Sequence, residues 1–485
     1  MKITLLRPMI ESGLNLECVG IQPPMGLGYL SSFLKANDYN IEIIDGFNGN
    51  LGNEILVEKS KDADLVGINC LTILYNSVVD LSIRLKKAGK TVILGGPHAS
   101  NSPEKTLAET GADYLSVGEG EELLLEVARA IESGRNPSDI YGLYTKSSGV
   151  PVRRNCPASL DDLPFPDWAQ MAPQKYKIPS YRDRFSDRNI IRPGRIAPVL
   201  TSRGCKMGCA GCDIAAQGMP VRYRTAGNIV DELEYLKENH GVEEFHFEDV
   251  NITSSRAHFE GICQEMLRRG FKTEWGMSSE VNTSVMEAEL IRLAAKAGCI
   301  YMGFQIGSAD PEMLRAYYSN VDLYQVVTAM EAAHRAGIMI AGCINMVIEK
   351  ESPESVKNTV EFLAGLPLKR ANINLLGSRE EPGAYYSVET LVKKLENDIG
   401  KKMWLSFEVI DKSDAYLYEF DICGACKRSS FSNVNENMNS ADEWNYYMTG
   451  EINFSDGTKP ELFIPGENGE DAYIYSNLEY NFIHL

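Results

Sequence analysis

Long apolar stretches are missing from this sequence of 485 residues. It has no run of about 18 or more apolar residues, so no membrane-spanning helix is predicted. Residues 1–8 predict a strand and lack the apolar region and small-residue cleavage site of a signal peptide. We therefore expect a cytoplasmic protein.

Positive charge and paired cysteines are scarce as well. Lys and Arg total 48 against 67 for Asp and Glu, and the net charge of −19 argues against nucleic-acid binding, which needs basic patches. The acidic balance is compatible with a polar or cationic substrate. The 11 cysteines are odd in number and show no spacing typical of a disulfide framework, so we expect reduced thiols.

Residues 1–140 alternate strand and helix patterns at the spacing of βαβ units. The expected strands are 2–6, 41–45, 65–70, 91–96 and 114–117, and the expected helices are 28–37, 77–88 and 121–132. Apolar strands between helices predict an open parallel α/β sheet that binds ligands at the carboxyl ends of its strands. Gly-rich turns at those ends allow a bulky ligand to approach the backbone. The motif GxGxxG is absent, so a dinucleotide is not indicated.

The rest of the chain predicts a linker and two further regions. Residues 141–195 are rich in proline and arginine, which predicts a linker without regular structure, packed across two domains. Residues 196–384 contain six strand–helix units, which predict a partial (β/α)6 barrel with its site at the carboxyl ends of the strands. The expected strands are 196–202, 244–249, 272–277, 300–305, 338–346 and 370–376, and the expected helices are 226–239, 256–269, 285–297, 322–336 and 353–364. Residues 385–485 predict an irregular α+β region, helical at 388–399, that recognises substrate or caps the barrel.

Three cysteines follow the first expected barrel strand at the spacing C-x3-C-x2-C, namely Cys205, Cys209 and Cys212. Three thiolates can hold three irons of a [4Fe–4S] cluster, which usually takes four cysteine ligands, so the fourth iron is left open to a non-protein ligand. A structural zinc site is the alternative, but such sites usually take four ligands, commonly in paired CxxC knuckles. An exposed cluster of this kind makes an oxygen-sensitive protein.

The segment Thr201–Cys212 resembles the signature of the radical S-adenosylmethionine (radical SAM) superfamily. The resemblance implies that the open iron binds SAM and that an electron, from an external donor of the flavodoxin or ferredoxin type, cleaves SAM to a 5′-deoxyadenosyl radical. Gly211 stands where the family usually has an aromatic residue, and Gln305 stands where it usually has glutamate. The implied SAM contacts are Arg203, Gly211, Glu248, Asp249, Asn251, Glu280 and Gln305. Arg203 could instead pair with an acid at a domain interface.

Three turns of the first domain resemble the cobalamin-binding subgroup of that superfamily: PPMGLGYL at 23–30, LGGPHA at 94–99 and GEGE at 118–121. The resemblance implies a Rossmann-like (flavodoxin-like) cobalamin-binding sheet. The implied cobalamin contacts are Pro24, Met25, Gly26, Tyr29, Leu71, Thr72, Tyr75, Gly95, Gly96, Pro97, His98, Gly118, Glu119 and Gly120. The motif DxHxxG, which would supply a lower axial histidine, is absent. His98 could therefore be a structural hydrogen-bonding residue, and Tyr29 and Tyr75 could be packing residues.

The resemblance implies a C-methyltransferase. The 5′-deoxyadenosyl radical would abstract hydrogen from an unactivated carbon of a small-molecule or peptide substrate, which would then take a methyl group from methylcobalamin. The alternative is a radical SAM enzyme that dehydrates, epimerises or cyclises its substrate, with Cys423 or Cys426 as hydrogen donor. These two cysteines form a CxxC that could also be a redox pair, an auxiliary metal ligand or two ordinary thiols. A non-catalytic metal or corrin carrier is a third possibility, but a carrier needs no open iron.

Overall fold

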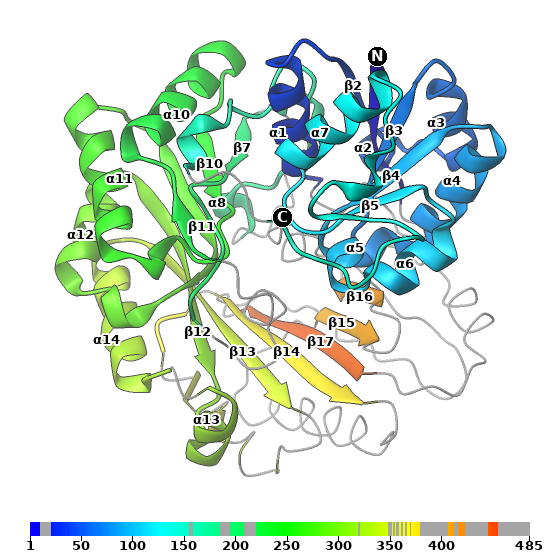
Figure 1. Ribbon diagram of the computed structural model, residues 1–485. Helices are drawn as coiled ribbons and strands as arrows, with labels where there is room; N and C mark the ends of the chain where they lie inside the picture. The colour runs from blue at the N-terminus through cyan, green and yellow to red at the C-terminus, as the bar shows by residue number, and fades with distance from the viewer. Residues whose placement is uncertain are drawn as a thin grey trace.

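The computed structural model consists of two α/β units that lie side by side (Figure 1). It describes residues 1–9, 21–154, 159–184, 195–207, 220–318, 321–347, parts of 352–368 and the backbone of four later strands at 370–378, 406–411, 416–421 and 445–453. Several predictions fall outside these residues. They concern Cys209, Gly211, Cys212, Cys423, Cys426 and the helix at 388–399.

The first unit is a doubly wound sheet. Its strands are β1 (Lys2–Arg7), β2 (Asn40–Asp45), β3 (Leu65–Asn69), β4 (Thr91–Gly95), β5 (Tyr114–Ser116) and β6 (Leu143–Tyr144). They pair in the order β2-β1-β3-β4-β5-β6, and all pairs are parallel except β5 with β6. The parallel part has the flavodoxin-like order, so the predicted fold of this unit is confirmed.

Helices cover both faces of this sheet (Figure 1). They are α1 (Met25–Lys35), α2 (Gly46–Gly49), α3 (Asn53–Lys59), α4 (Tyr75–Lys87), α5 (Pro97–Asn101), α6 (Pro103–Thr110) and α7 (Glu121–Glu132). The short helices α2, α3, α5 and α6 were not expected from the sequence, because each spans too few residues to show a helical apolar period. Helix α1 begins three residues before its predicted start, directly after Pro24, because proline before the first turn needs no N–H donor.

The second unit is a curved parallel sheet that stays open. Its strands are β7 (Ile196–Val199), β10 (Glu244–Phe247), β11 (Glu274–Val281), β12 (Cys299–Gly307), β13 (Met339–Val347) and β14 (Arg370–Ser378). They pair in this order, with β7 at one edge. At the other edge β17 (Asn445–Asn453) pairs antiparallel with β14. The predicted partial barrel is confirmed, and β17 extends it with a strand from the last part of the chain.

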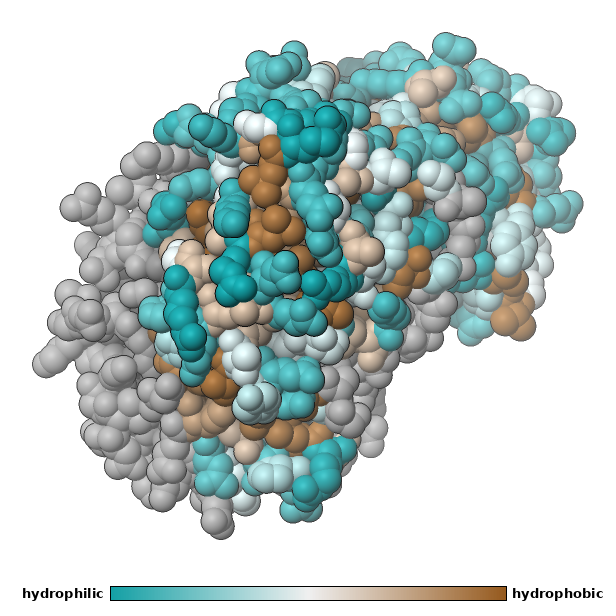
Figure 2. Space-filling model, turned by 90° about the vertical axis from the view of Figure 1, so that its left-hand side faces the viewer, coloured by the Kyte–Doolittle hydropathy of each residue, from teal (hydrophilic) through white to brown (hydrophobic). Residues whose placement is uncertain are grey.

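The outer face of the barrel sheet is covered by helices. They are α10 (Ala226–His240), α11 (Arg256–Arg269), α12 (Ala288–Lys296), α13 (Pro311–Tyr317) and α14 (Leu323–Arg335). Side chains of Thr225, Ser255 and Asp322 accept hydrogen bonds from the first-turn N–H groups of α10, α11 and α14 and so fix where these helices start. Their outer surface is largely hydrophilic, with smaller apolar areas between the polar side chains (Figure 2).

The segment between the two units packs against both. Asp167 accepts hydrogen bonds from Ser31 and Lys35 of α1, and the Nε1 atom of Trp168 donates to Glu232 of α10 over 2.9 Å. The expectation that this segment lacks regular structure was wrong in two places. Strand β6 adds to the edge of the first sheet, and α8 (Tyr181–Arg184) enters the second unit.

The last described strands reach back to the first unit. Strands β15 (Ser406–Asp411) and β16 (Tyr416–Asp421) form an antiparallel hairpin. Strand β16 contacts the 3-10 turn Thr72–Leu74 that follows β3. These later strands therefore touch both units. Among the described residues, no helix has the length and apolar character needed to cross a bilayer.

Candidate functional site

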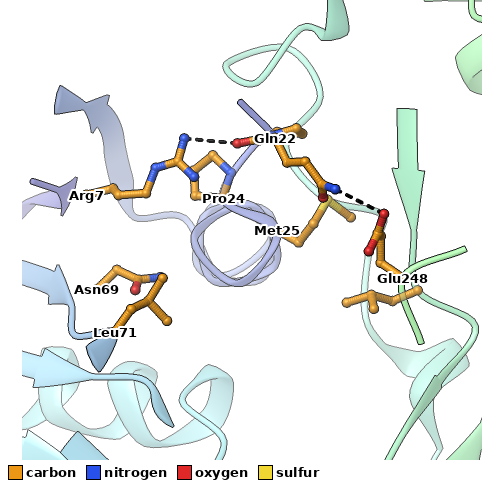
Figure 3. A pocket seen from close by; sticks show the side chains of 9 residues that line it. Arg7, Gln22, Pro24, Met25, Asn69, Leu71 and Glu248 are labelled. Atoms are coloured by element: carbon orange, nitrogen blue, oxygen red, sulfur yellow. Dashed lines mark hydrogen bonds between the residues drawn. The ribbon is translucent and has the colours of Figure 1, made fainter. Parts of the chain in front are cut away.

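The carboxyl ends of the two sheets enclose one small pocket (Figure 3). The first sheet and the loop before α1 line one side of it, and the ends of barrel strands line the other. The lining residues are Arg7, Gln22, Pro23, Pro24, Met25, Asn69, Leu71, Leu200 and Glu248. Ligands of parallel α/β sheets bind at this edge, so the pocket is the place where a group shared by both units would lie.

Asn69 marks the ligand side of the first sheet. It is the last residue of β3, and β3 lies next to β1, where the strand order reverses. Asn69 is only 5% exposed, and its Oδ1 atom is buried without a hydrogen-bond partner among the described residues. A buried polar atom without a partner is costly, so a ligand that donates a hydrogen bond fits here. The predicted contacts Pro24, Met25 and Leu71 line the same pocket, and an amide group of cobalamin would supply the hydrogen bond that Asn69 Oδ1 lacks.

Glu248 marks the barrel side of the pocket. It is 3% exposed, and its Oε1 atom accepts hydrogen bonds from Gln22 Nε2 over 3.1 Å and from Ser278 Oγ over 2.6 Å. The hydroxyl of Tyr181 lies 3.0 Å from the same Ser278 oxygen. The glutamate is thus held by a loop of the first unit and by a barrel strand. Gln22, Asn69, Ser278 and Tyr181 were missed from the sequence, because nothing local marks their contacts.

Asp249 holds the chain that leads into the cysteine segment. Its carboxylate accepts hydrogen bonds from the backbone N of Thr201 over 3.0 Å, from Thr201 Oγ1 over 2.8 Å and from Ser202 Oγ over 2.6 Å. Burial raises the pKa of Asp249 to about 6, although these hydrogen bonds act in the opposite direction. Thr201 Oγ1 also lies 2.8 Å from Nε2 of His258, whose pKa is lowered to about 4 by burial and then by the charge of Arg224.

The raised pKa of Asp249 predicts a slope in stability against pH. Between about pH 4 and pH 6 the folded state keeps a proton on Asp249 that the unfolded chain has lost, so the free energy of unfolding falls as pH rises. A difference of roughly 2 pKa units corresponds to about 3 kcal/mol. Urea titration gives the free energy of unfolding of wild type and of Asp249→Asn at each pH. We expect the wild-type value minus the variant value to fall by about 3 kcal/mol between about pH 4 and pH 6. His258 contributes an opposite slope in both proteins, and a flat difference curve would contradict the assignment.

The cysteine segment starts at the end of a two-residue ladder. Strand β8 (Ser202–Arg203) pairs antiparallel with β9 (Arg222–Tyr223), so the chain between them, which we call the cluster loop, leaves and returns at the same place. Cys205 lies at the start of this loop, past the carboxyl end of β7. Cys209 and Cys212 lie outside the described residues. A thiol past the carboxyl end of a barrel strand fits an iron–sulfur cluster, because such clusters are held by cysteine thiolates.

Arg203 binds acids of the first unit. Its Nη1 atom lies 3.2 Å from Oε2 of Glu119, and its Nη2 atom lies 2.6 Å from Oε1 of Glu121. Its guanidinium also lies 5.1 Å from the ring centroid of Tyr29. This is the domain-interface pairing that the sequence offered as the alternative to SAM contact. Burial opposes the charge of both partners, but the attraction between them outweighs it, so the pKa of Arg203 is raised and that of Glu121 is lowered.

The other predicted SAM contacts lie at the ends of neighbouring barrel strands. Asn251 follows β10, is 7% exposed and accepts a hydrogen bond from Thr253. Glu280 of β11 lies opposite Gly303 of β12 in the strand register. Gln305 lies further along β12 and is partly buried. These residues share the carboxyl edge of the barrel with Glu248 and Asp249, and their contacts with SAM stay predictions.

Predicted cobalamin contacts in the segments that follow β3 and β4 pack against one another. His98 Nδ1 lies 3.2 Å from Oγ1 of Thr72, and the His98 ring lies 4.0 Å from that of Tyr75. Tyr75 donates a hydrogen bond to Glu109 over 2.5 Å, and both rings are buried. These contacts agree with the packing roles that the sequence left open for His98 and Tyr75.

The predicted turns of the first unit differ in what surrounds them. Gly95 ends β4, and Gly96 and Pro97 follow it, where His98 N donates to the backbone oxygen of Cys70 over 3.2 Å. Gly26 lies in the first turn of α1 and next to the pocket-lining Met25. Gly118, Glu119 and Gly120 follow β5 and face the barrel through the ion pairs of Glu119. Of these turns, the one at 24–26 therefore lies at the pocket.

Two family models match the chain. The radical SAM superfamily matches residues 199–363, and the B12 binding domain matches residues 12–128. An uncharacterised methyltransferase of Pyrococcus horikoshii is 28% identical over 77% of this chain and 80% of that protein. The anaerobic magnesium-protoporphyrin IX monomethyl ester cyclase of Rubrivivax gelatinosus is 26% identical over 75% of this chain and 65% of that protein.

A solved structure shares the arrangement of the two units. It is the radical S-adenosylmethionine methyltransferase TsrM from Kitasatospora setae with cobalamin and [4Fe-4S] cluster bound. It has a TM-score of 0.63 and 18% sequence identity, and the match covers 77% of this chain and 75% of that one. This likeness concerns the fold.

Proposed function

Because the chain belongs to the radical SAM superfamily and carries a B12-binding domain, we propose that it is a cobalamin-dependent radical SAM C-methyltransferase. The observation that supports this most strongly is the pocket lined by the strand ends of both units. Asn69 and Leu71 line it from the first sheet, and Leu200 and Glu248 line it from the barrel side. A substrate in this position would lie between the two cofactors.

The bound groups supply the hard chemistry. With the cluster, SAM and cobalamin in place, a 5′-deoxyadenosyl radical can remove hydrogen from carbon and cobalamin can deliver a methyl group. The chain supplies the ligands and the orientation. Cys205, Cys209 and Cys212 would hold the cluster, and Asp249 fixes the strand end from which their loop starts. The buried carboxamide of Asn69 would hydrogen-bond to cobalamin.

Glu248 supports a polar or cationic small molecule as substrate. It is a buried carboxylate at the pocket, and it is oriented by Gln22 and Ser278. A carboxylate held in this way can accept a hydrogen bond from an ammonium or hydroxyl group. The net charge of −19 favours the approach of a cation. A peptide with such a group is compatible with the same site.

Radical SAM enzymes take electrons from external donors, and we propose a flavodoxin or ferredoxin for this chain. We also propose a cytoplasmic location, because a reducing compartment suits the cluster and the thiols of Cys70, Cys263 and Cys299. The proposed domains are 1–140 for cobalamin, 141–195 as linker, 196–384 for the cluster and SAM, and 385–485 for capping or substrate recognition. The pairing of β17 with β14 and the contact of β16 with the turn after β3 support the capping role.

The cyclase relative supports a second candidate, a radical SAM enzyme that does not methylate. In that case Cys423 or Cys426 would donate hydrogen to the substrate radical. Both cysteines lie outside the described residues. This candidate predicts SAM cleavage without methyl transfer.

Isotope labelling distinguishes these candidates. The protein would be reconstituted anaerobically with iron, sulfide and hydroxocobalamin, reduced, and given SAM with a deuterated methyl group and candidate amine or alcohol substrates. We expect 5′-deoxyadenosine, S-adenosylhomocysteine and a product that carries the label. Formation of 5′-deoxyadenosine without S-adenosylhomocysteine or bound corrin would favour the second candidate. Absence of SAM cleavage would contradict both.

A further inference from the structure

Four side chains join the first unit to the base of the cluster loop. We call Glu119, Glu121, Arg203 and Arg222 the clasp. Arg203 contacts both glutamates, and Arg222 contacts Glu119 through both Nη atoms, with Nη1 at 3.1 Å. Their side chains are 5–13% exposed, so these ion pairs are shielded from water. Such pairs are far less screened by salt than surface pairs.

The clasp arginines face each other across the ladder that closes the cluster loop. Arg203 of β8 pairs directly with Arg222 of β9. Like charges at directly opposite positions of two antiparallel strands destabilise the pairing. Glu119 contacts both guanidinium groups and so compensates this repulsion. The ladder at the base of the cluster loop is therefore stabilised by a carboxylate of the other unit.

The glutamates of the clasp are themselves rigidly placed. Gly118 has a φ of 97°, and a Cβ atom there would lie 2.2 Å from the backbone oxygen of Arg154. Its N–H donates to Ser100 Oγ over 3.0 Å. Glu121 is the first residue of α7, where a negative charge is favoured by the helix dipole. The turn at 118–120 is therefore closely packed, and the clasp joins it to the ladder at the base of the cluster loop.

We propose that the clasp couples the two cofactor sites, so that loading of the cluster strengthens cobalamin binding and the reverse. The proposal rests on the proposed function, because it requires that both groups bind. The turn that carries Glu119 ends β5 at the carboxyl edge of the cobalamin-binding sheet, and the ladder that Glu119 closes carries the cluster. The same ion pairs join the turn and the ladder, so a cofactor that stabilises the position of one also stabilises that of the other. Coupling between two binding sites is reciprocal by thermodynamic necessity.

The test compares hydroxocobalamin affinity with and without the cluster. The dissociation constant would be measured anaerobically by quenching of tryptophan fluorescence, in protein free of iron and in reconstituted protein. We expect the cluster to tighten binding at least about fivefold in wild type. In Glu119→Gln we expect the dissociation constants of the iron-free and the reconstituted protein to differ by no more than about twofold, since the link between the sites is lost. Because the two dissociation constants are compared within one variant, a direct effect of Glu119 on cobalamin affinity cancels in their ratio.

The reverse effect provides a second measurement. In wild type, hydroxocobalamin should slow the removal of iron by a chelator by a similar factor, and in Glu119→Gln it should not. The double variant E119Q/R222Q removes one charge of each sign and leaves the pair Arg203–Glu121, so it tests the coupling in a protein with a balanced clasp. In this double variant, too, neither cofactor should strengthen the binding of the other.

Glu122→Gln is the matched control. Glu122 lies next to Glu121 in α7, and it pairs with Arg154 over 3.0 Å. This variant should keep the wild-type ratio. Equal affinities of both wild-type forms, or a wild-type ratio in E119Q, would overturn the coupling while leaving the proposed function intact. Failure of hydroxocobalamin to bind either form would overturn the proposed function as well.

Discussion

Replacing Cys205 by alanine should reduce SAM cleavage to the uncatalysed background. Three thiolates are the fewest that leave a single open iron on a [4Fe–4S] cluster, and two would leave a second iron without a protein ligand. Cys205 follows strand β8 by two residues, so as a ligand it would anchor the cluster to the part of the loop that Asp249 and the clasp hold in place. Iron and sulfide content after reconstitution and the yield of 5′-deoxyadenosine measure the effect.

Cys263→Ala is the control for this experiment. Cys263 is fully buried in α11, and burial raises the pKa of its thiol, so it is an inert packing residue. Its replacement should leave about four irons per chain and wild-type SAM cleavage. If Cys205→Ala retained the iron content and SAM cleavage of the control, the assignment of Cys205 as a cluster ligand would be wrong.

Replacing Tyr181 by alanine should lower the free energy of unfolding by about 3–5 kcal/mol. Tyr181 is fully buried, and its ring stacks on Tyr301 at 4.2 Å and lies 4.0 Å from His246. Gly276 leaves the room for it, because a Cβ atom there would lie 2.5 Å from the Tyr181 ring. The ring therefore fills the interior of the barrel, and no neighbouring side chain can replace it.

Two further variants separate packing from hydrogen bonding at this site. Tyr181→Phe keeps the ring and loses the hydroxyl near Ser278, so we expect a loss of about 1 kcal/mol. Tyr324→Ala removes a tyrosine that is 80% exposed and should change stability by no more than about 0.5 kcal/mol. Urea titration measures all three. If Tyr181→Ala were no more destabilising than Tyr324→Ala, the interior filling by Tyr181 would be refuted.

The longer strands and helices were predictable because each carries its own local pattern. Buried strands such as β3 read as short apolar runs, and helices such as α7 read as amphipathic stretches. Their alternation implies parallel sheets, and the Gly-rich turns and the cysteine spacing indicate the ligand-binding edges. For the same reason the predicted partial barrel was confirmed strand by strand.

The contacts that shape the site were not predictable in this way. Gln22 and Glu248 are 226 positions apart in the chain, and neither neighbourhood indicates the other. The ring of Tyr181 enters the barrel from a segment whose prolines suggested only a linker. The pairing of Arg203 with an interface acid was foreseen as an alternative, but the partners Glu119 and Glu121 were not. Such pairs depend on how the two units dock, which no local period encodes.

The antiparallel pairing of β17 with β14 has a consequence for biosynthesis. Strand β14 ends at Ser378, and its partner begins only at Asn445. At a synthesis rate of about 5–20 residues per second, the edge of β14 stays uncovered for several seconds after it leaves the ribosome. An unpaired strand edge is a template for pairing with other chains. Truncation before β17 should therefore produce protein that aggregates, even though every expected cofactor ligand of the first two units has already been made.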